Sequence, residues 1–388
     1  MDVDRFITHS LQDPRIARIL AAALDAVEPA KLVRDYLQKT VLPEHDRVFL
    51  LGIGKAAESM TFAAAEILTA FTDAFIVTKH ISGRTFERVI VMEGGHPIPD
   101  KRSLAAGQAV LDFVSKLNEN DLLICLISGG GSALATAPHE GITLEEIQLK
   151  TASLLANGAT IHEINSLRRQ LDRIKGGGLA RATKAQVISL ILSDVIGNSL
   201  DTIASGLTVD SSLETRVQNI IVGDLRIAAQ AAQKEANAEG FDSEILNLQI
   251  QGEAKEVGLR LARKLKEEKI KRKTPFCLIA GGETTVTIKG NGKGGRNQEV
   301  ALAAVDELNG LNNVMLISLA TDGDDGPTDA AGAVVTGESY QLAKKVGMVA
   351  SDYMSRNDAY PFFEKLGDLL KPGYTGTNVN DLIFLIGL

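Results

Sequence analysis

The sequence predicts an α/β protein with two domains, each built around an open sheet with helices packed against it. Three observations lead to this prediction. The chain has 388 residues, which is long for a single hydrophobic core. Short apolar runs of β type alternate with longer helical segments, as in an open parallel sheet. This alternation pauses at the charged segment 262–273 and restarts after Thr274, which indicates a second domain.

The first half of the chain is expected to form a parallel sheet with helices between its strands. The runs at 122–127 and 187–192 are apolar throughout, as in strands buried on both faces, and are far shorter than the ~20 residues of a membrane-spanning helix. The expected strands are Arg47–Leu51, Ala74–Thr78, Arg88–Met92, Asp121–Ile127, Val187–Leu192 and Asn219–Val222. The expected helices are those within the first forty residues, Lys55–Phe71, Ser103–Leu117 and Thr160–Arg173.

The second half repeats the pattern on a smaller scale. Its expected strands are Phe276–Ala280, Thr284–Lys289, Val314–Ala320, Ala333–Val335 and Leu382–Ile386. We place the domain boundary at the glycine at 240, which gives domains 1–240 and 241–388. The segment 241–249 fits either side of this boundary.

Composition excludes several classes of protein. The N-terminus MDVDRF is acidic where a signal peptide is basic, so we expect no export. A net charge of −8 and the absence of Trp argue against a general nucleic-acid binder, and no segment suits a membrane. Cys125 and Cys277 both lie in apolar strands without metal-type spacing, which fits a reducing cytoplasm.

The region 281–332 carries the strongest chemical signal. Lys293 and Arg296 stand among glycines just before a helical run, an arrangement that suits a phosphate. An apolar strand then ends in a group of carboxylates that suits a hard cation such as Mg²⁺. These carboxylates belong to Asp322, Asp324, Asp325 and Asp329. A protein that holds a phosphate and Mg²⁺ is expected to be a phosphotransferase, although the chain contains no P-loop motif.

A second glycine turn, GIGKAA, follows the first strand. Gly52 and Gly54 with Ala57 are close to the dinucleotide fingerprint. The next strand ends in Thr78 and Lys79 where NAD requires an acidic residue, so NAD is disfavoured and only NADP stays open. Lys55 opens the following helix, where a cation opposes the helix dipole, and this indicates an anionic ligand.

A third loop, Gly129-Gly130-Gly131-Ser132, follows a fully apolar strand. Its glycines allow close approach of a ligand, and Ser132 suits either a helix cap or a hydrogen bond to phosphate. A serine-hydrolase reading is disfavoured because the final glycine of a nucleophile elbow is missing. His96, in the turn EGGHPIPD, is interpreted as structural.

Further polar residues follow other predicted elements. Arg168 and Lys175 are expected to face one side of a single helix, where both could contact one anion. Asp194 ends an apolar strand at the sheet edge where such folds bind ligands, so it suits Mg²⁺ or a substrate hydroxyl. Before the last strand, TGTNVND offers a polar cluster that could close a site or form a turn. Its members are Thr375, Thr377, Asn378, Asn380 and Asp381.

Together these segments resemble the class II glycerate kinases, or glycerate 2-kinases, whose C-terminal half is called the MOFRL domain. The matching motifs occur in the family's order from about residue 50 to residue 385. They are GIGKAA, GGHPIPD, LISGGGSAL, IKGGGLA, SDVIGNSLDTIASGLT, GGRNQE, TDGDDGPTDAAG and GTNVND. The resemblance implies a Rossmann-like N-terminal domain, a smaller α/β C-terminal domain and an active site in the cleft between them. It also implies ATP-dependent phosphorylation of D-glycerate, usually at the 2-hydroxyl, with Mg²⁺.

The resemblance also assigns roles to residues. The essential lysine and arginine of the family fall on Lys55 and Arg296, and the carboxylates of its cleft on Asp194 and Asp322, either of which could hold the metal. We assign nucleotide or substrate binding to Gly52, Gly54, Gly129, Gly130, Gly131, Ser132, Arg168, Lys175, Glu283, Gly294, Gly295, Asn297, Asn378 and Asn380. The sequence departs from the common pattern of the family at Gln170, Asn198 and Leu207.

Two other functions stay open on the sequence. One is an NAD(P)H-dependent hydroxypyruvate reductase, and the other is a sugar-phosphate-binding module without catalysis. The expected ligands are ATP and D-glycerate. A homodimer is the default expectation because two-fold homo-oligomers are common.

Overall fold

A computed structural model describes residues 1–156 and 161–388, and the chain divides into two compact units. One unit comprises Pro29–Asp224, and the other comprises Met1–Glu28 together with Leu225–Leu388. This division differs from the expected domains 1–240 and 241–388. The cause is the amphipathic helix α1 (Pro14–Asp25), which buries Ile16, Ile19 and Leu20 and packs against α9 (Leu225–Ala238) of the C-terminal unit.

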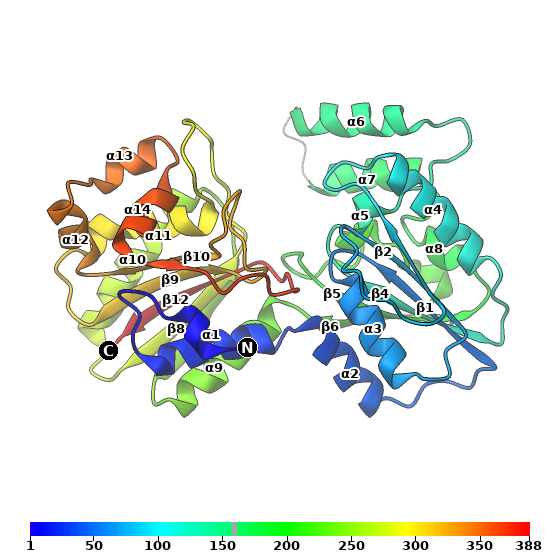
Figure 1. Cartoon of the computed structure of the whole chain (residues 1–388), viewed down its shortest axis with the longest axis horizontal. Coiled ribbons are helices and arrows are strands. Elements are labelled where there is room, and N and C mark those ends of the chain that lie inside the picture. The colour runs from blue at the N-terminus through cyan, green and yellow to red at the C-terminus, as the bar shows by residue number, and fades with distance from the viewer. Residues whose placement is uncertain (157–160) are drawn as a thin grey trace. The chain divides into compact units, whose positions relative to one another are not determined.

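The unit Pro29–Asp224 is built on a parallel sheet with the strand order β3-β2-β1-β4-β5-β6. This order is that of a Rossmann-type sheet, and it places the topological switch between β1 and β4. Helices α2 and α3 cover one face and α4 the other (Figure 1). The strands are β1 (Arg47–Ile53), β2 (Asp73–Thr78), β3 (Val89–Glu93), β4 (Asp121–Ile127), β5 (Gln186–Leu192) and β6 (Val217–Gly223). The helices are α2 (Pro29–Lys39), α3 (Ala57–Ile67), α4 (Lys101–Val114), α5 (Gly131–Leu134), α6 (Leu144–Ala156), α7 (Ile161–Leu171), α8 (Gly178–Arg181) and the 3-10 turns Ile203–Ser205 and Ser211–Leu213.

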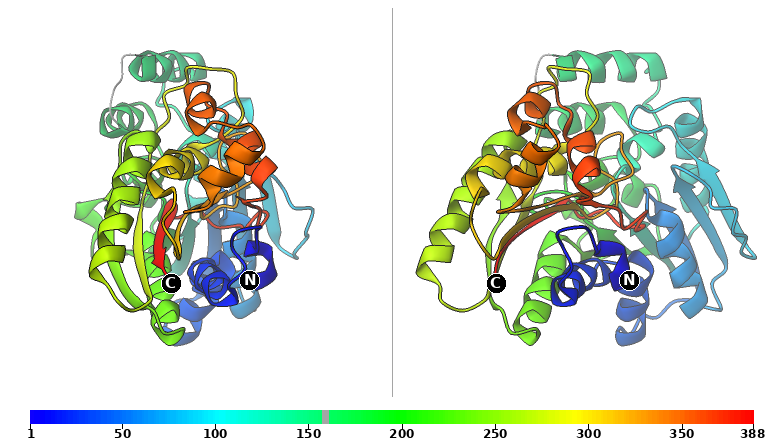
Figure 2. Two further views of the ribbon diagram at one scale, coloured as in Figure 1. Left: turned by 90° about the vertical axis from the view of Figure 1, so that its left-hand side faces the viewer. Right: turned by 60° about the vertical axis from the view of Figure 1, so that its left-hand side comes forward.

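The second unit holds a mixed sheet with the strand order β11-β10-β9-β12-β8-β7. Only β7 and β8 pair in parallel; every other neighbouring pair is antiparallel. In the right-hand view of Figure 2, α1 lies on one side of this sheet and α11 to α14 lie on the other. The strands are β7 (Asp242–Ile250), β8 (Phe276–Gly282), β9 (Val314–Ala320), β10 (Gly332–Thr336), β11 (Leu369–Leu370) and β12 (Asp381–Gly387). The remaining helices are the 3-10 turn Val3–Phe6, α10 (Ala254–Lys271), α11 (Arg296–Leu308), α12 (Ser339–Lys345), α13 (Ala350–Ser355) and α14 (Ala359–Leu366).

Most of the expected strands are confirmed, and Asp121–Ile127 and Val314–Ala320 have their expected bounds. The strand expected at Thr284–Lys289 is wrong, because this segment makes only an isolated bridge between Thr285 and Glu253. The ambiguous segment 241–249 belongs with the second sheet, where β7 pairs with β8. In the helix expected at Thr160–Arg173, Thr160 lies outside the described residues. None of the helices in residues 1–156 and 161–388 is long and apolar enough to cross a membrane.

Candidate active site

Two loops at the carboxyl edge of the parallel sheet are hydrogen-bonded to each other at the switch between β1 and β4. The backbone N–H of Lys55 donates to the carbonyl of Gly129 over 3.0 Å, and the N–H of Ala56 donates to Ser128 Oγ over 3.0 Å. Ser128 N–H donates in turn to the carbonyl of Ile53. These bonds hold the GIGKAA turn against the Gly129–Ser132 loop.

The same bonds argue against a dinucleotide site in the GIGKAA turn. A pyrophosphate would need free N–H groups there, but those of Lys55 and Ala56 are used as described and that of Gly54 donates to the carbonyl of Val77. Gly52 serves close packing, since a Cβ atom at this position would lie 2.3 Å from Thr61 Oγ1 in α3. The turn therefore fixes the backbone of Lys55. The hypothesis of a nicotinamide-dependent reductase loses the dinucleotide site on which it depends.

Four basic side chains gather around the Gly129–Ser132 loop. A Cβ atom at Gly130 would lie 3.0 Å from His96 Cδ2 and 3.2 Å from Lys55 Cγ, so these two side chains flank the glycine. Partial burial, followed by the charges of Lys55, Lys79 and Arg168, lowers the pKa of His96 to about 4. Among the side chains that the structure describes, no carboxylate forms an ion pair with any of these three cations. A neutral imidazole beside three cations suits an anionic ligand.

His96 thus lies beside the glycine loop, although its turn in the sequence indicates only a structural role. The available signal was the segment EGGHPIPD, which recurs in the family pattern but shows no charge partners in sequence. Lys79 likewise follows β2 and was considered only for NADP.

Asp194 lies beside the same loop. It follows β5, and a Cβ atom at Gly129 would lie 1.9 Å from its Oδ2 atom, so only glycine leaves room for this carboxylate. Asn198 donates through Nδ2 to Asp224, the residue that follows β6. The edge of the sheet thus carries carboxylates after β5 and β6 and cations after β1 and β2.

Arg168 and Lys175 are separated by the structure. Helix α7 ends at Leu171, so the expectation of one helix carrying both residues on one side is wrong. Lys175 is 2% exposed and forms an ion pair with Asp172 at 2.6 Å, which places it in the interior of its unit. Arg168 instead reaches the glycine loop, with Nη1 3.5 Å from Ser132 Oγ.

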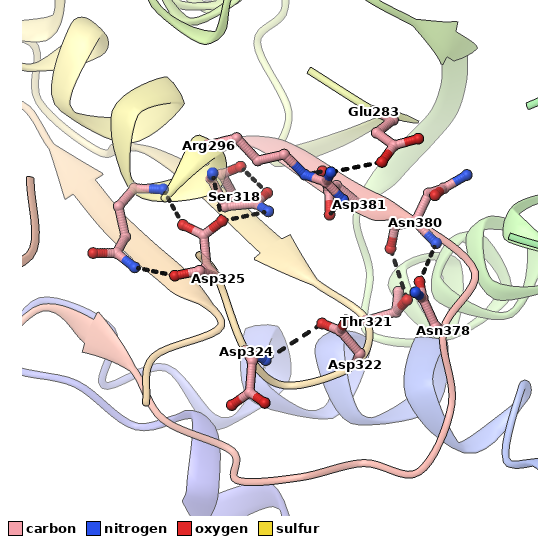
Figure 3. Close-up of polar contacts among 12 residues, drawn as sticks. Glu283, Arg296, Ser318, Thr321, Asp322, Asp324, Asp325, Asn378, Asn380 and Asp381 are labelled. Carbon is pink, nitrogen blue, oxygen red and sulfur yellow. Dashed lines mark hydrogen bonds and ion pairs between the residues drawn. The ribbon is translucent and has the colours of Figure 1, made fainter. Parts of the chain in front are cut away.

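In the C-terminal unit, Arg296 opens α11 and is held by two carboxylates (Figure 3). Its Nε and Nη2 atoms donate to Asp381 over 2.7 and 3.2 Å, and Nη1 donates to Glu283 over 2.7 Å. Burial opposes the charge of Arg296, but the charges of Asp381 and Glu283 outweigh it and raise its pKa. The sequence singles out Asp381 only as a member of the polar TGTNVND cluster, and its pairing with Arg296, 85 residues away, has no signal in the sequence.

The start of α11 is occupied by a carboxylate of the chain itself. Asp325 is 2% exposed and accepts the N–H groups of Asn297 and Gln298 over 3.1 and 2.9 Å. Burial raises its pKa to about 6 against these hydrogen bonds, which favour the charged form. Gly295 caps the helix directly against Asp325, where a Cβ atom would lie 2.3 Å from its Cγ.

The glycine loop before α11 is also engaged within its own unit. Gly292 N–H donates to the carbonyl of Arg356, and Lys293 N–H donates to Asp358 Oδ1. Gly294 packs beside Ala359. The N–H groups at 292, 293, 297 and 298 are thus bonded within this unit, and the expectation that Gly294 and Gly295 bind nucleotide or substrate stays a prediction.

The aspartates of the acidic loop after β9 make separate contacts, and the expectation that Asp322 or Asp194 holds a metal stays a prediction. Asp325 caps α11, and Asp322 Oδ1 accepts the N–H of Asp324 (Figure 3). Asp329 accepts from the hydroxyl of Tyr360 and from the ammonium of Lys371. Across the described ranges, no group of three or more His, Cys, Asp or Glu residues could hold a metal ion. Asp322 is half-buried, and of the four aspartates in this loop it lies nearest the end of β9.

The TGTNVND segment ties the last strand to the acidic loop. Thr321, the residue before Asp322, donates through Oγ1 to the carbonyl of Asn380 over 2.7 Å. Asn378 Oδ1 accepts the N–H of Asn380, which holds this turn in shape (Figure 3). The amide of Asn297 is buried and accepts from Ser318 Oγ on β9. Asn297 connects α11 to β9, and Asn380 connects the TGTNVND turn to Thr321, the residue before Asp322. Asn378 holds that turn in shape.

Comparison with known proteins supports the resemblance over most of the chain. Residues 15–236 match a family described as a domain of unknown function, DUF4147, and residues 276–381 match the MOFRL family. A D-glycerate 2-kinase from Thermotoga maritima is 42% identical, over 95% of this chain and 96% of that protein. The chain belongs to the glycerate 2-kinase family. A glycerate 2-kinase from Pyrococcus horikoshii, at 35% identity, also matches over 95% of this chain and 96% of its own.

Structural comparison agrees. The crystal structure of a glycerate kinase from Thermotoga maritima superposes with a TM-score of 0.90 at 40% identity, covering 96% of this chain and 98% of that one. The expectations of a Rossmann-like parallel sheet and of a C-terminal MOFRL domain are confirmed. The expected position of a glycerate kinase site in a cleft between the domains stays a prediction.

Proposed function

We propose that this protein is an ATP-dependent kinase that phosphorylates D-glycerate at its 2-hydroxyl. The observation that carries the proposal is the group formed by Lys55, Lys79, His96 and Arg168, which brings three cations and a neutral imidazole to the switch point of a parallel sheet. Relatives named as glycerate 2-kinases match over nearly their whole length, which supports the same substrate and donor.

Lys55 is proposed to stabilise the phosphoryl group during transfer. Phosphoryl transfer passes through a loose transition state with negative charge spread over three oxygens, so a fixed cation in a partly dry site is the main requirement. The bonds between the GIGKAA turn and the Gly129–Ser132 loop support this role, because they fix the backbone of Lys55.

Arg296 is proposed to be the second cation that contacts the phosphates, through only part of its guanidinium. Its buried bidentate contact with Asp381 acts as an anchor, and its Nη1 contact with the exposed Glu283 is exchangeable. Exposed ion pairs contribute only ~0–1 kcal/mol, so a phosphate oxygen can replace Glu283 at little cost. Glu283 then regulates access to the guanidinium.

The residues fit Mg²⁺ that is held mostly by nucleotide phosphates and one carboxylate, as is common for this ion. Asp322 is the preferred ligand, and Asp194 would orient or deprotonate the 2-hydroxyl of glycerate. Bound Mg²⁺ would neutralise charge on the phosphates of ATP. We also expect a cytoplasmic protein. We expect a homodimer as well, and sedimentation of the purified protein would test this oligomeric state.

The test is to incubate the purified protein with ATP, Mg²⁺ and D-glycerate, to measure ADP release and to identify the phosphoglycerate isomer by ³¹P NMR. We expect 2-phosphoglycerate as the product, with the Lys55→Ala variant as the control for contaminating kinases. Release of ADP no faster than without glycerate would refute the proposal, and 3-phosphoglycerate would refute the choice of hydroxyl.

A further inference from the structure

Arg168 lies at the end of a chain of hydrogen bonds that starts in the interior of the parallel-sheet unit. Helix α7 presents Asn165 and Arg168 three residues apart, and both reach toward the Gly129–Ser132 loop. Ser205 connects the two, since its hydroxyl lies 2.8 Å from Ser132 Oγ and 3.1 Å from Asn165 Oδ1. Asn165 and Ser205 are 3% and 0% exposed, so these contacts are screened from water.

The direction of every bond in this chain follows from chemistry. The carbonyl of Thr202 can only accept, so Asn165 turns Nδ2 toward it and Oδ1 toward Ser205. Ser205 must then donate its single hydrogen to Asn165, and it accepts from the hydroxyl of Ser132. Ser132 therefore has only lone pairs left, and these face Nη1 of Arg168 at 3.5 Å. In this network Ser132 has no hydrogen left to donate to another group.

The backbone at Ser205 is itself unusual, which indicates a functional constraint. Ala204, Ser205 and Gly206 are three consecutive residues with positive φ, of 49°, 59° and 65°. A left-handed conformation destabilises a non-glycine residue by ~1–2 kcal/mol, and such conformations gather at functional sites. Without this turn the hydroxyl of Ser205 would not reach both Ser132 and Asn165.

Arg168 is thus a half-buried guanidinium that is oriented by a neutral acceptor and lacks a carboxylate among the described side chains. Its planar fork matches a carboxylate in bidentate geometry, whereas Lys55 is a point charge suited to a phosphoryl group. We propose that Arg168 binds the carboxylate of the hydroxy-acid substrate, and that Asn165 and Ser205 are positioning residues that orient it through Ser132. This rests on the proposed kinase function and names Arg168 as the residue that selects an acid over a neutral polyol.

The test uses steady-state kinetics of the full chain with each substrate varied separately. Arg168→Gln should raise KM for D-glycerate by about 10- to 100-fold, the usual effect of losing a hydrogen bond to a charged group, and leave KM for ATP within about two-fold. It should also abolish the preference for D-glycerate over D-glyceramide, in which a neutral amide replaces the carboxylate. Arg169→Gln is the matched control, because the adjacent Arg169 donates to the carbonyl of Asp201 and, among the described side chains, makes no contact with the glycine loop.

Ser205→Ala tests the positioning role. It should raise KM for D-glycerate by about 2- to 10-fold with kcat and KM for ATP retained, as for loss of one neutral hydrogen bond. A purely structural role would instead lower the melting temperature without this selective change in KM.

A readout independent of catalysis separates this proposal from the kinase proposal. D-glycerate without ATP should raise the melting temperature of the wild type and of Arg169→Gln but not that of Arg168→Gln. If Arg168→Gln does not fold, Arg168→Lys keeps the charge without the fork and should still raise KM for D-glycerate selectively. A selective rise in KM for ATP would overturn the carboxylate assignment in favour of a nucleotide phosphate. No change in either KM or in the thermal shift would overturn it as well, whereas a wild type that binds D-glycerate without phosphorylating it would overturn only the kinase proposal.

Discussion

The anchoring of Arg296 by Asp381 predicts a large and unequal effect of removing its two partners. In Asp381→Asn the guanidinium loses a bidentate partner that is itself 4% exposed. Removing one member of a buried ion pair costs ~3–5 kcal/mol, and because 31% of the Arg296 side chain is exposed we take the lower end, ~3 kcal/mol. At ~2–4 °C per kcal/mol for a unit of this size, the melting temperature of the C-terminal unit should fall by ~6–12 °C.

Glu283→Gln is the matched control, because it removes the other carboxylate from the same guanidinium. The Glu283 side chain is 48% exposed, so its loss should change stability by less than ~1 kcal/mol. Differential scanning calorimetry of the three proteins at equal concentration measures both effects. Equal shifts for the two variants, or a negligible shift for Asp381→Asn, would refute the division into an anchor and an exchangeable contact.

Three further predictions concern the parallel-sheet unit. Lys55→Ala should lower kcat/KM by ~10²–10³ with an unchanged melting temperature, as for removal of one charge aimed at a transition state; near-wild-type turnover would contradict its role. Gly129→Ala should displace Asp194, since the new Cβ atom would lie 1.9 Å from its carboxylate, and lower kcat at least ~10-fold, whereas full activity would show that this carboxylate is dispensable. Stability should fall as the pH drops from 6.5 toward 4. The unfolded chain protonates His96 near its ordinary pKa of 6.5, whereas the folded chain protonates it only near its lowered pKa of about 4. Between these values the folded chain binds fewer protons, so protonation favours unfolding. His96→Gln should flatten this part of a plot of melting temperature against pH, and an unchanged profile would contradict the lowered pKa of His96.

The strands could be predicted from sequence where burial leaves a local pattern. The runs 121–127 and 314–320 are buried at every position, and a continuous apolar segment marks them without knowledge of their neighbours. The error at Thr284–Lys289 arose because alternating β-type residues form a strand only when a neighbouring strand is available. Only Thr285 found a partner, in Glu253.

The sequence could predict which residues belong to the candidate site but not which residues contact one another there. Lys55, Asp194 and Arg296 follow strands or open helices, and sheet topology brings such positions to one edge. Sequence could not show that Asp325 would fill the start of α11, nor that the glycine loop would bond to residues 356–358. Both features depend on contacts between segments about 28 and 65 residues apart, and no local pattern encodes them.

The domain boundary failed for a related reason. Proximity in sequence suggested that the first 28 residues belong with the strands that follow them. The apolar stripe of α1 instead packs with α9 in the other unit, so the C-terminal unit is assembled from both ends of the sequence.

The position of β12 in its sheet has a consequence for how the protein can be made. Strand β12 (Asp381–Gly387) follows every other strand of its sheet in chain order, yet it pairs with β8 on one side and β9 on the other. A ribosome therefore releases every other strand of this sheet before the one that joins them, whereas residues 29–224 are all released before β12. A premature stop before Asp381 would divide the sheet into two unpaired halves, and the anchor of Arg296 would be lost with β12.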